Sequence, residues 1–308
     1  MKIQKTRWIA LTALIAGLSL ASSAQAYWGL DTTPTATVGD SSNSAYTVQM
    51  SGFYAANDAN NKVTGSNWVA NSLTQFAGNG QGMYSGSDNG SPYHALDNNQ
   101  NTEGVLLSFS ASTVLTSIGL GYTSNSEISC KNNSTQAMTY QNGGSCANGT
   151  TQVGSGLVDV SVFRWVGGAS GPTGSAGLTN TGSATMAGWE LVGNYGDMVQ
   201  DTSNPYNTVN GSGKTSSWWL ITAYNSGFAQ TSNGTNTIAT ENRATLTNGD
   251  DFFKLYAVAG TKCTQTVNNK GVCGGTNLNV PEPASLALTS VALIGVAGLR
   301  RRKIKLAA

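Results

Sequence analysis

His94 is the only histidine in the chain, so a Ser-His-Asp or Cys-His centre would have to use it. Asp97 follows three residues later, but no Gly-x-Ser-x-Gly elbow is present to expose a serine nucleophile. A working centre also needs a nucleophile, a base and an orienting group to converge. We therefore interpret His94 as a loop or strand-edge residue hydrogen-bonded to backbone. We expect the protein not to be an enzyme, and a secreted hydrolase is the lowest-ranked alternative.

Paired carboxylates are a second chemistry to consider, because glycoside hydrolysis uses two Asp or Glu side chains about 5–9.5 Å apart. Fourteen acids lie between residues 27 and 280, so some pair is inevitable and the sequence singles out none. Glu103, Glu190 and Asp197 are the candidates that a structure has to test.

Oxygen-bearing side chains recur at alternate positions in Asp97, Asn99, Asn101 and Glu103, and oxygen is the ligand that Ca²⁺ prefers. The run lacks the sixth-position glycine and the twelfth-position glutamate of an EF-hand loop. It is similar to loops that precede the first core strand of discoidin-like carbohydrate-binding sandwiches, which implies Ca²⁺-dependent sugar binding. The alternative is a cluster of Asx turns at the start of the next strand. Apart from this Ca²⁺ we expect no cofactor.

Four cysteines fall into two local pairs in the part of the chain that we expect to be exported. An oxidising compartment permits disulfides, and four cysteines allow three connectivities. We predict Cys130–Cys146 and Cys263–Cys273, because each bond closes a loop rich in Asn, Gly, Ser and Thr. A loop of roughly 15 residues gains about 3 kcal/mol in the chain-entropy description. Zinc is disfavoured, since there is no C-x-x-C spacing and the one histidine is remote.

The first 26 residues are typical of a secretory signal peptide. A basic start, an apolar stretch over residues 8–20 and a small-x-small site ending at Ala26 follow one another. We predict export by the Sec machinery and cleavage between Ala26 and Tyr27. The alternative is an uncleaved membrane anchor, for which the apolar stretch is short.

The C-terminal segment 280–308 has three parts in a fixed order. Pro281, Glu282 and Pro283 come first, and an uncharged stretch over residues 284–299 follows. As a helix that stretch spans about 24 Å, against about 30 Å of hydrocarbon, so it crosses a membrane only marginally. The last part is a basic cluster that should stay cytoplasmic: Arg300, Arg301, Arg302, Lys303 and Lys305.

This order and terminal position resemble the PEP-CTERM sorting signal. Such tails are recognised by exosortase, a transpeptidase-like membrane enzyme of Gram-negative bacteria that also make exopolysaccharide. The resemblance covers residues 280–305 and implies that Pro281, Glu282 and Pro283 form the recognition motif. It further implies a transient inner-membrane intermediate, held by the C-terminal helix, and then display at the cell surface or in the extracellular matrix.

The body, residues 27–279, also resembles exosortase-dependent surface proteins in scattered segments, with residues 130–146 as an insertion. That resemblance implies a surface location and no particular activity. The segments are 94–98, 105–109, 159–164, 217–221 and 251–255.

The composition of the body excludes nucleic acid as a partner. Only 10% of the chain is charged, against about 25% in a typical globular domain. Residues 27–280 hold eight Lys and Arg against fourteen Asp and Glu, a net charge near −6. A nucleic-acid-binding face would need the opposite balance in order to neutralise phosphates.

Period-two alternation of apolar residues predicts about eight strands separated by turns rich in Gly, Asn, Ser and Thr. Three stretches are expected to be loops: 125–156, 167–187 and 200–216. Trp218 and Trp219 should point to opposite faces of a strand, so one belongs to the core and the other could stack on a sugar. The predicted strands are 46–53, 68–76, 105–109, 114–122, 158–166, 189–195, 218–224 and 252–258.

We therefore predict an all-β protein whose body is one antiparallel β-sandwich, or jelly-roll-like domain. A signal helix precedes the body, and one short transmembrane helix follows it. The first-ranked function is a non-enzymatic cell-surface or extracellular-matrix component. The chief alternative is a carbohydrate-binding module, dependent on Ca²⁺, that retains exopolysaccharide.

Overall fold

The computed structural model describes residues 25–63, 68–85, 92–142, 144–168, 170–172, 187–200, 206–228, 246, 251–268 and 271–274. Within these ranges the chain forms strands, turns and bends and no helix, which confirms the predicted all-β class. The predicted signal helix and the predicted helix over residues 284–299 lie outside the described ranges. None of the residues that the structure describes belongs to a helix long and apolar enough to cross a membrane.

The described residues form two antiparallel sheets, one of thirteen strands and one of three. All eight predicted runs overlap strands, but 68–76 is divided into two strands and 105–109 and 114–122 belong to a single one. The large sheet contains β1 (Gln25–Gly29), β2 (Val38–Gly39), β3 (Thr47–Ala56), β4 (Val69–Asn71), β5 (Leu73–Phe76), β6 (Gly80–Met83), β7 (Leu96–Asp97), β8 (Asn101–Ser124), β12 (Val158–Trp165), β13 (Trp189–Met198), β14 (Tyr206–Thr208), β15 (Ser216–Ala223) and β16 (Phe252–Lys262). The small sheet contains β9 (Glu127–Asn132), β10 (Met138–Asn142) and β11 (Thr150–Ser155).

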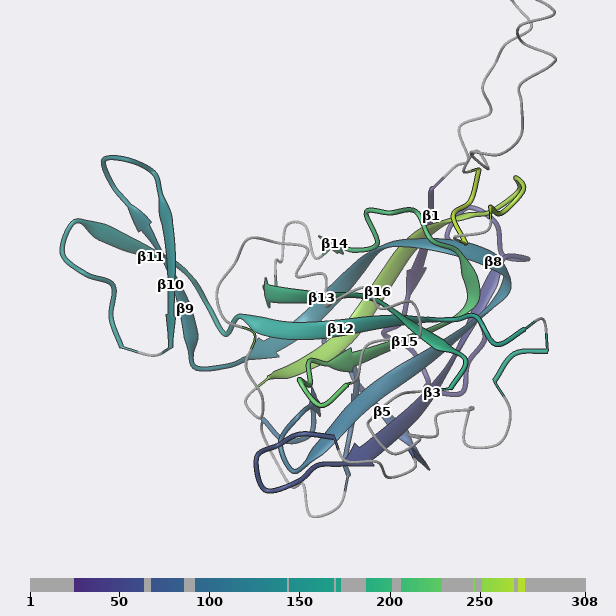
Figure 1. The fold of residues 1–308 in the computed structure, drawn as a ribbon, viewed down its shortest axis with the longest axis horizontal. Coiled ribbons are helices and arrows are strands. Elements are labelled where there is room, and N and C mark those ends of the chain that lie inside the picture. The colour runs from purple at the N-terminus through teal and green to yellow at the C-terminus, as the bar shows by residue number, and fades with distance from the viewer. Residues whose placement is uncertain are drawn as a thin grey trace, which may run out of the picture.

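Strand β8 is 24 residues long and takes part in both layers of the sandwich. Its first half, up to Phe109, pairs with β3 on one side and β15 on the other. Its second half, from Thr113 onward, pairs with β16 on one side and β14 on the other. Between the halves the pairing with β15 jumps from Ser108 to Thr113, so β8 leaves the ladder and turns a corner, as Figure 1 shows.

The main core lies between the two halves of β8. Leu107 from the first half and Ile118 from the second belong to one buried hydrophobic cluster. Because successive side chains of a strand face opposite ways, Leu106 points to the outer face. There it joins a second cluster that Trp68 and Phe228 cover from outside the strands. The first layer is therefore apolar on both faces.

The Trp218–Trp219 pair follows the same alternation. Trp219 is fully buried in the main core, whereas Trp218 is half-buried and packs against the outer cluster. The prediction of opposite faces is confirmed, and the outer ring is largely taken up by packing.

Part of the expected loop 125–156 is instead the three-stranded sheet, which projects from the side of the body as an arm (Figure 1). Strand β9 is central, with β10 and β11 on its two sides. Ile128 and Cys130 are among its few buried apolar side chains. The period-two signal was missed because the strands consist mainly of Thr, Ser, Asn and Gln. The expected loop 200–216 likewise contains β14.

Both predicted disulfides are confirmed. Cys130–Cys146 holds the arm, with Cα atoms 5.6 Å apart. Cys263–Cys273 joins the residue after β16 to the segment 271–274, with Cα atoms 5.7 Å apart. The described residues include no free cysteine.

Trp28 provides a test of the core, because it anchors the short strand β1. Its ring is fully buried between Tyr46 and Phe109, at centroid distances of 4.8 and 4.9 Å, and its Nε1–H donates to the Tyr46 carbonyl at 3.0 Å. Trp28→Ala should lower the free energy of unfolding by about 3–5 kcal/mol in a urea titration, since it leaves a cavity. Trp218→Ala is the control and should cost clearly less. Equal losses would contradict this view of the core.

Candidate functional site

His94 lies in a turn before β7, and its ring lies among three aromatic side chains and one lysine. Its Nε2 is 3.0 Å from Nζ of Lys254 on β16. The rings of Phe76, Tyr84 and Tyr122 surround it, at centroid distances of 4.6, 6.1 and 6.5 Å. We call Phe76, Tyr84, His94, Tyr122 and Lys254 the aromatic cage. The turn position agrees with the sequence prediction, whereas the lysine neighbour had no sequence signal.

Lys254 is the central cation of this cage and is only 3% exposed. Its ammonium lies 4.2 Å from the Phe76 ring centroid and 4.3 Å from that of Tyr122. Burial lowers the pKa of Lys254 below its ordinary 10.5. A lysine of this kind suits either Schiff-base chemistry or a packing role. Its burial favours packing, because a substrate carbonyl could not reach the amine.

The cage does not supply the parts of a hydrolase. All four cysteines are bonded in pairs, so no thiol is available for a Cys-His centre. Asp97, the acid nearest to His94 in sequence, accepts the Asn99 backbone N–H at 2.9 Å through Oδ1. That contact is an Asx turn, which was the alternative reading of this loop.

Glu190 takes part in an ion cluster instead of pairing with a second carboxylate. One of its oxygens accepts from Arg164, with Nε at 3.0 Å, and the other accepts from Lys214. Asp197 lies seven residues further along the same strand, a separation of about 20 Å at strand rise. That separation is too large for a glycosidase pair.

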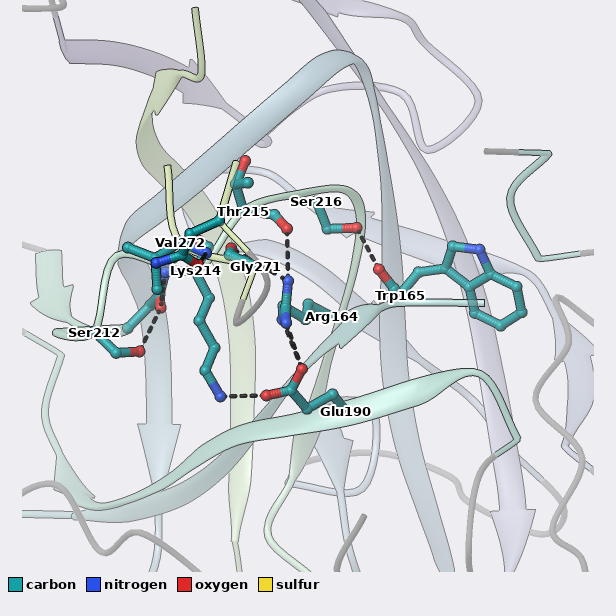
Figure 2. Close-up of polar contacts among 11 residues, drawn as sticks. Arg164, Trp165, Glu190, Ser212, Lys214, Thr215, Ser216, Gly271 and Val272 are labelled. Carbon is teal, nitrogen blue, oxygen red and sulfur yellow. Dashed lines mark hydrogen bonds and ion pairs between the residues drawn. The ribbon is translucent and has the colours of Figure 1, made fainter. Parts of the chain in front are cut away.

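The same ion cluster connects the segment 271–274 to the large sheet (Figure 2). Nη1 of Arg164 donates to the carbonyl oxygens of Thr215 and Gly271, at 3.0 and 3.4 Å. The Thr215 N–H in turn donates to the Gly271 carbonyl at 2.9 Å. Arg164 and Glu190 are both buried, so removing Glu190 would take away the carboxylate that Arg164 pairs with, whereas removing Arg164 would leave Glu190 paired with Lys214.

The proposed Ca²⁺ ligands lie at the junction of β7 and β8. Asp97 and Glu103 are fully buried, and Glu103 Oε2 accepts the Asp97 backbone N–H at 3.3 Å. Asn101 donates through Nδ2 to Ser85 at 3.1 Å. The Glu103 carboxylate therefore contacts the backbone of Asp97. Among the described residues, no group of three or more His, Cys, Asp and Glu side chains is placed to hold a metal.

Asp251, directly before β16, is the centre of a buried polar network. Its Oδ1 accepts from Asn125 at 2.9 Å and from the Asp159 backbone N–H at 2.8 Å. Its Oδ2 accepts from Asn98 at 2.8 Å, and Asn98 Oδ1 accepts the Asp251 N–H in return. Burial, followed by the charges of Asp159 and Asp251, raises the pKa of the Tyr224 phenol. The network joins the starts of β12 and β16 to the base of the arm.

A groove of about 510 Å³ lies between the 33–35 loop and strands β3, β4 and β5. Hydroxyl, amide and aliphatic groups line it, and no charged side chain does. Its rim includes Asn71, whose Nδ2 donates to the Tyr84 carbonyl at 2.6 Å. Tyr84 itself is 45% exposed and stacks on His94. Such a surface suits an uncharged ligand.

The remaining predicted site residues are divided between β1 and the undescribed tail. Ala26 and Tyr27, the predicted cleavage pair, both lie in β1, where Ala26 is 4% exposed. The sorting motif and the basic cluster lie outside the described ranges.

Comparison with known proteins bears on the tail alone. Residues 279–303 match the PEP-CTERM protein-sorting motif, which confirms the prediction made from Pro281, Glu282 and Pro283. The motif implies that exosortase sorts the protein to the cell surface. No curated protein and no solved structure matches the chain. The expected similarity of the body to exosortase-dependent surface proteins therefore finds no support.

The packing role of Lys254 leads to a test in the alkaline range. Because its folded-state pKa is lowered, the unfolded chain holds this proton up to about pH 10.5 while the folded chain releases it earlier. The lysine's contribution to stability therefore rises with pH in that window. Lys254→Met should equal or exceed wild type in free energy of unfolding at pH 7, and this advantage should shrink toward pH 10.5.

Lys262→Met is the matched control, since that lysine is exposed and lies 6.0 Å from the Tyr46 ring centroid. This variant loses the same charge at an exposed position outside the cage. A Lys254→Met variant that loses several kcal/mol at every pH would refute the packing role.

Proposed function

We propose that this chain is an exported, exosortase-sorted surface or extracellular-matrix component whose body is non-enzymatic. The observation that carries the proposal is the PEP-CTERM match at residues 279–303, directly after an all-β body with two disulfides. Disulfides suit an oxidising compartment outside the cytoplasm, as a sorted surface protein requires.

The proposed route to the surface uses both ends of the chain. The Sec machinery exports the chain, and signal peptidase cleaves it after Ala26. The stretch 284–299 then holds it in the inner membrane, with the basic cluster on the cytoplasmic side. Exosortase recognises Pro281, Glu282 and Pro283 and releases the body for attachment outside.

Three features of the described residues support a non-enzymatic body. The one histidine faces a buried lysine and aromatic rings. Both cysteine pairs form disulfides. Glu190 is engaged with Arg164 and Lys214, about 20 Å along β13 from Asp197. None of these arrangements combines a nucleophile with a base and an orienting group.

The double variant Pro281→Ala, Glu282→Ala tests the sorting step. We expect it to stay unprocessed in the inner membrane, because exosortase loses its recognition motif while the hydrophobic stretch remains. Cell fractionation and intact-mass analysis of the released protein measure this. Pro172→Ala with Glu127→Ala changes the same residue types in the body and should leave processing intact. Normal release of the tail variant would refute the proposal.

Carbohydrate binding is the second candidate function. The uncharged groove beside Asn71, together with the exposed Tyr84 ring, offers hydrogen-bonding groups and an aromatic face to a neutral sugar. Exopolysaccharide outside the cell would be the ligand. We further propose Ca²⁺ at Asp97 and Glu103, because both residues are fully buried and a Glu103 oxygen lies 3.3 Å from the Asp97 backbone nitrogen, and a divalent cation would offset the cost of burying two negative charges.

Glycan-array binding of the full-length exported protein, with Ca²⁺ and with EDTA, tests this candidate. Tyr84→Ala should weaken binding about tenfold, or 1.4 kcal/mol, and a thermal melt establishes that the variant is folded. Ca²⁺ at a hundred times its dissociation constant should stabilise wild type by about 2.7 kcal/mol, and Asp97→Ala should abolish that gain. Asp58→Ala, at an exposed acid in a surface turn, should retain it. The absence of binding to every glycan on the array would refute sugar binding.

A further inference from the structure

The backbone nitrogen of Tyr27 points at a carboxylate. Its N–H donates to Oδ1 of Asp40 at 2.8 Å, and the Ser41 N–H donates back to the Tyr27 carbonyl at 3.0 Å. The turn that begins at Asp40 is thus bonded to both the N–H and the carbonyl of Tyr27. Tyr27 is also the residue that the signal-peptide pattern places first in the mature chain.

Asp40 is a buried acid, only 6% exposed. Ser42 donates its hydroxyl to Oδ2 at 2.6 Å, and the Ser41 hydroxyl lies 3.5 Å from Oδ1. Neutral donors therefore surround the charge. Across the described ranges, no Lys, Arg or His forms an ion pair with this carboxylate.

Cleavage between Ala26 and Tyr27 would change the charge of one atom at this site. Hydrolysis consumes one water, leaves the new carboxylate on Ala26 and leaves the amine on Tyr27, where it takes up a proton. The nitrogen that donates one neutral hydrogen bond to Asp40 in the uncleaved chain becomes an ammonium with three donors. The unperturbed pKa of an α-amine is about 7.7–8.0, so that ammonium predominates at neutral pH.

We propose that Asp40 is a built counter-ion for the mature N-terminus, so that signal-peptide removal completes a buried ion pair between the Tyr27 ammonium and the Asp40 carboxylate. This inference rests on the export and cleavage that the proposed function requires.

The neighbouring residues are arranged to hold the new terminus in place. Trp28 is fully buried, and its indole N–H is bonded to the Tyr46 carbonyl at 3.0 Å. Two residues further on, the Leu30 N–H donates to the Tyr256 carbonyl at 2.7 Å. Cleavage gives up the pairing of Gln25 and Ala26 with the end of β16, while Tyr27 to Gly29 stay in register. The ion pair compensates for the shortened strand.

The charged and titratable groups around this site are few. Tyr46 lies in the bend just before β3. Burial raises the pKa of Tyr46 to about 12; a hydrogen bond with Thr113 opposes this rise, and the Asp40 charge adds to it. Tyr206 lies against the Tyr27 ring at a centroid distance of 5.6 Å. Lys262 reaches over the Tyr46 ring from the end of β16. Tyr46 and Tyr206 both have raised pKa values and are neutral at pH 7, so the amine and Asp40 are the charged groups in contact at this site.

The geometry determines the direction of the pH effect. Burial raises the pKa of Asp40, but hydrogen bonds from Ser42, Tyr27 and Asn43 together bring it below its ordinary 3.8. An opposite charge at hydrogen-bond distance should raise the pKa of the amine. The ion pair between the Tyr27 ammonium and Asp40 therefore contributes fully to the free energy of unfolding between roughly pH 4 and pH 7.7. It is lost below this window as Asp40 takes up a proton, and above it as the amine loses one.

The test uses the exported full-length protein in two forms. One has its own cleavage site and should start at Tyr27, and the other carries a foreign signal peptide cut before Gln25. Intact mass first establishes where each chain starts. The α-amine is then titrated through its rate of acylation, read by mass spectrometry of the N-terminal peptide. In the Tyr27 form we expect an amine pKa at least one unit above the ordinary range, and so acylation about tenfold slower at pH 7.

Asp40→Asn should restore ordinary acylation in the Tyr27 form. It should also lower the melting temperature of that form more than that of the longer form. Asp31→Asn is the matched control, since that half-buried acid accepts from Gln75 and from the Gly78 backbone N–H. If the chain starts at Tyr27 and its α-amine has an ordinary pKa, the ion pair is refuted and the cleavage site is not. A chain that starts elsewhere would overturn both the cleavage site and the ion pair. If Asp40→Asn fails to fold, the titration of the α-amine in the wild-type Tyr27 form still tests the ion pair.

Discussion

The body depends on a single strand that serves two layers. Strand β8 must pair with β3 and β15 over its first half and with β16 and β14 over its second, and both halves must face one core. This constraint makes the corner at residues 109–112 obligatory, because a straight strand of 24 residues would carry its second half out of the core. Leu107 and Ile118 meet across the core only because the chain turns between them. Most other strands of the body are positioned by their pairing with β8 or by the strands paired to it.

Much of this architecture is visible in the sequence. Alternation such as Val158, Val160 and Val162 marks the strands, because a half-buried pleat imposes period two on apolar side chains. The disulfide pairs follow from proximity in the chain, and the sorting tail follows from composition and order. The arm was missed because its strands bury few side chains, so pairing and a disulfide stabilise it in place of a core. Alternation cannot report such strands.

The candidate sites were harder to predict, because their members come together only through long-range pairing. Lys254 reaches His94 across 160 residues, and Arg164 reaches Gly271 across 107. Nothing local distinguishes Asp251 from any other acid in a turn, although it accepts three hydrogen bonds from distant segments. Asp97 and Glu103 are only six residues apart, so their proximity could be expected from the sequence. Sequence motifs therefore predict contacts between residues that are close in the chain, but not contacts between buried polar groups that long-range strand pairing brings together.

The Cys263–Cys273 bond also decides how the body would bear a mechanical load. A protein held at the surface by its C-terminal end is pulled through the residue that follows Cys273. The covalent link passes that force directly to the end of β16 and bypasses the hydrogen-bonded loop between the two cysteines. From there it spreads over the antiparallel ladders that join β16 to β8 and β1. A load on the C-terminal end would thus reach the paired strands of the large sheet without first pulling out the residues between the two cysteines.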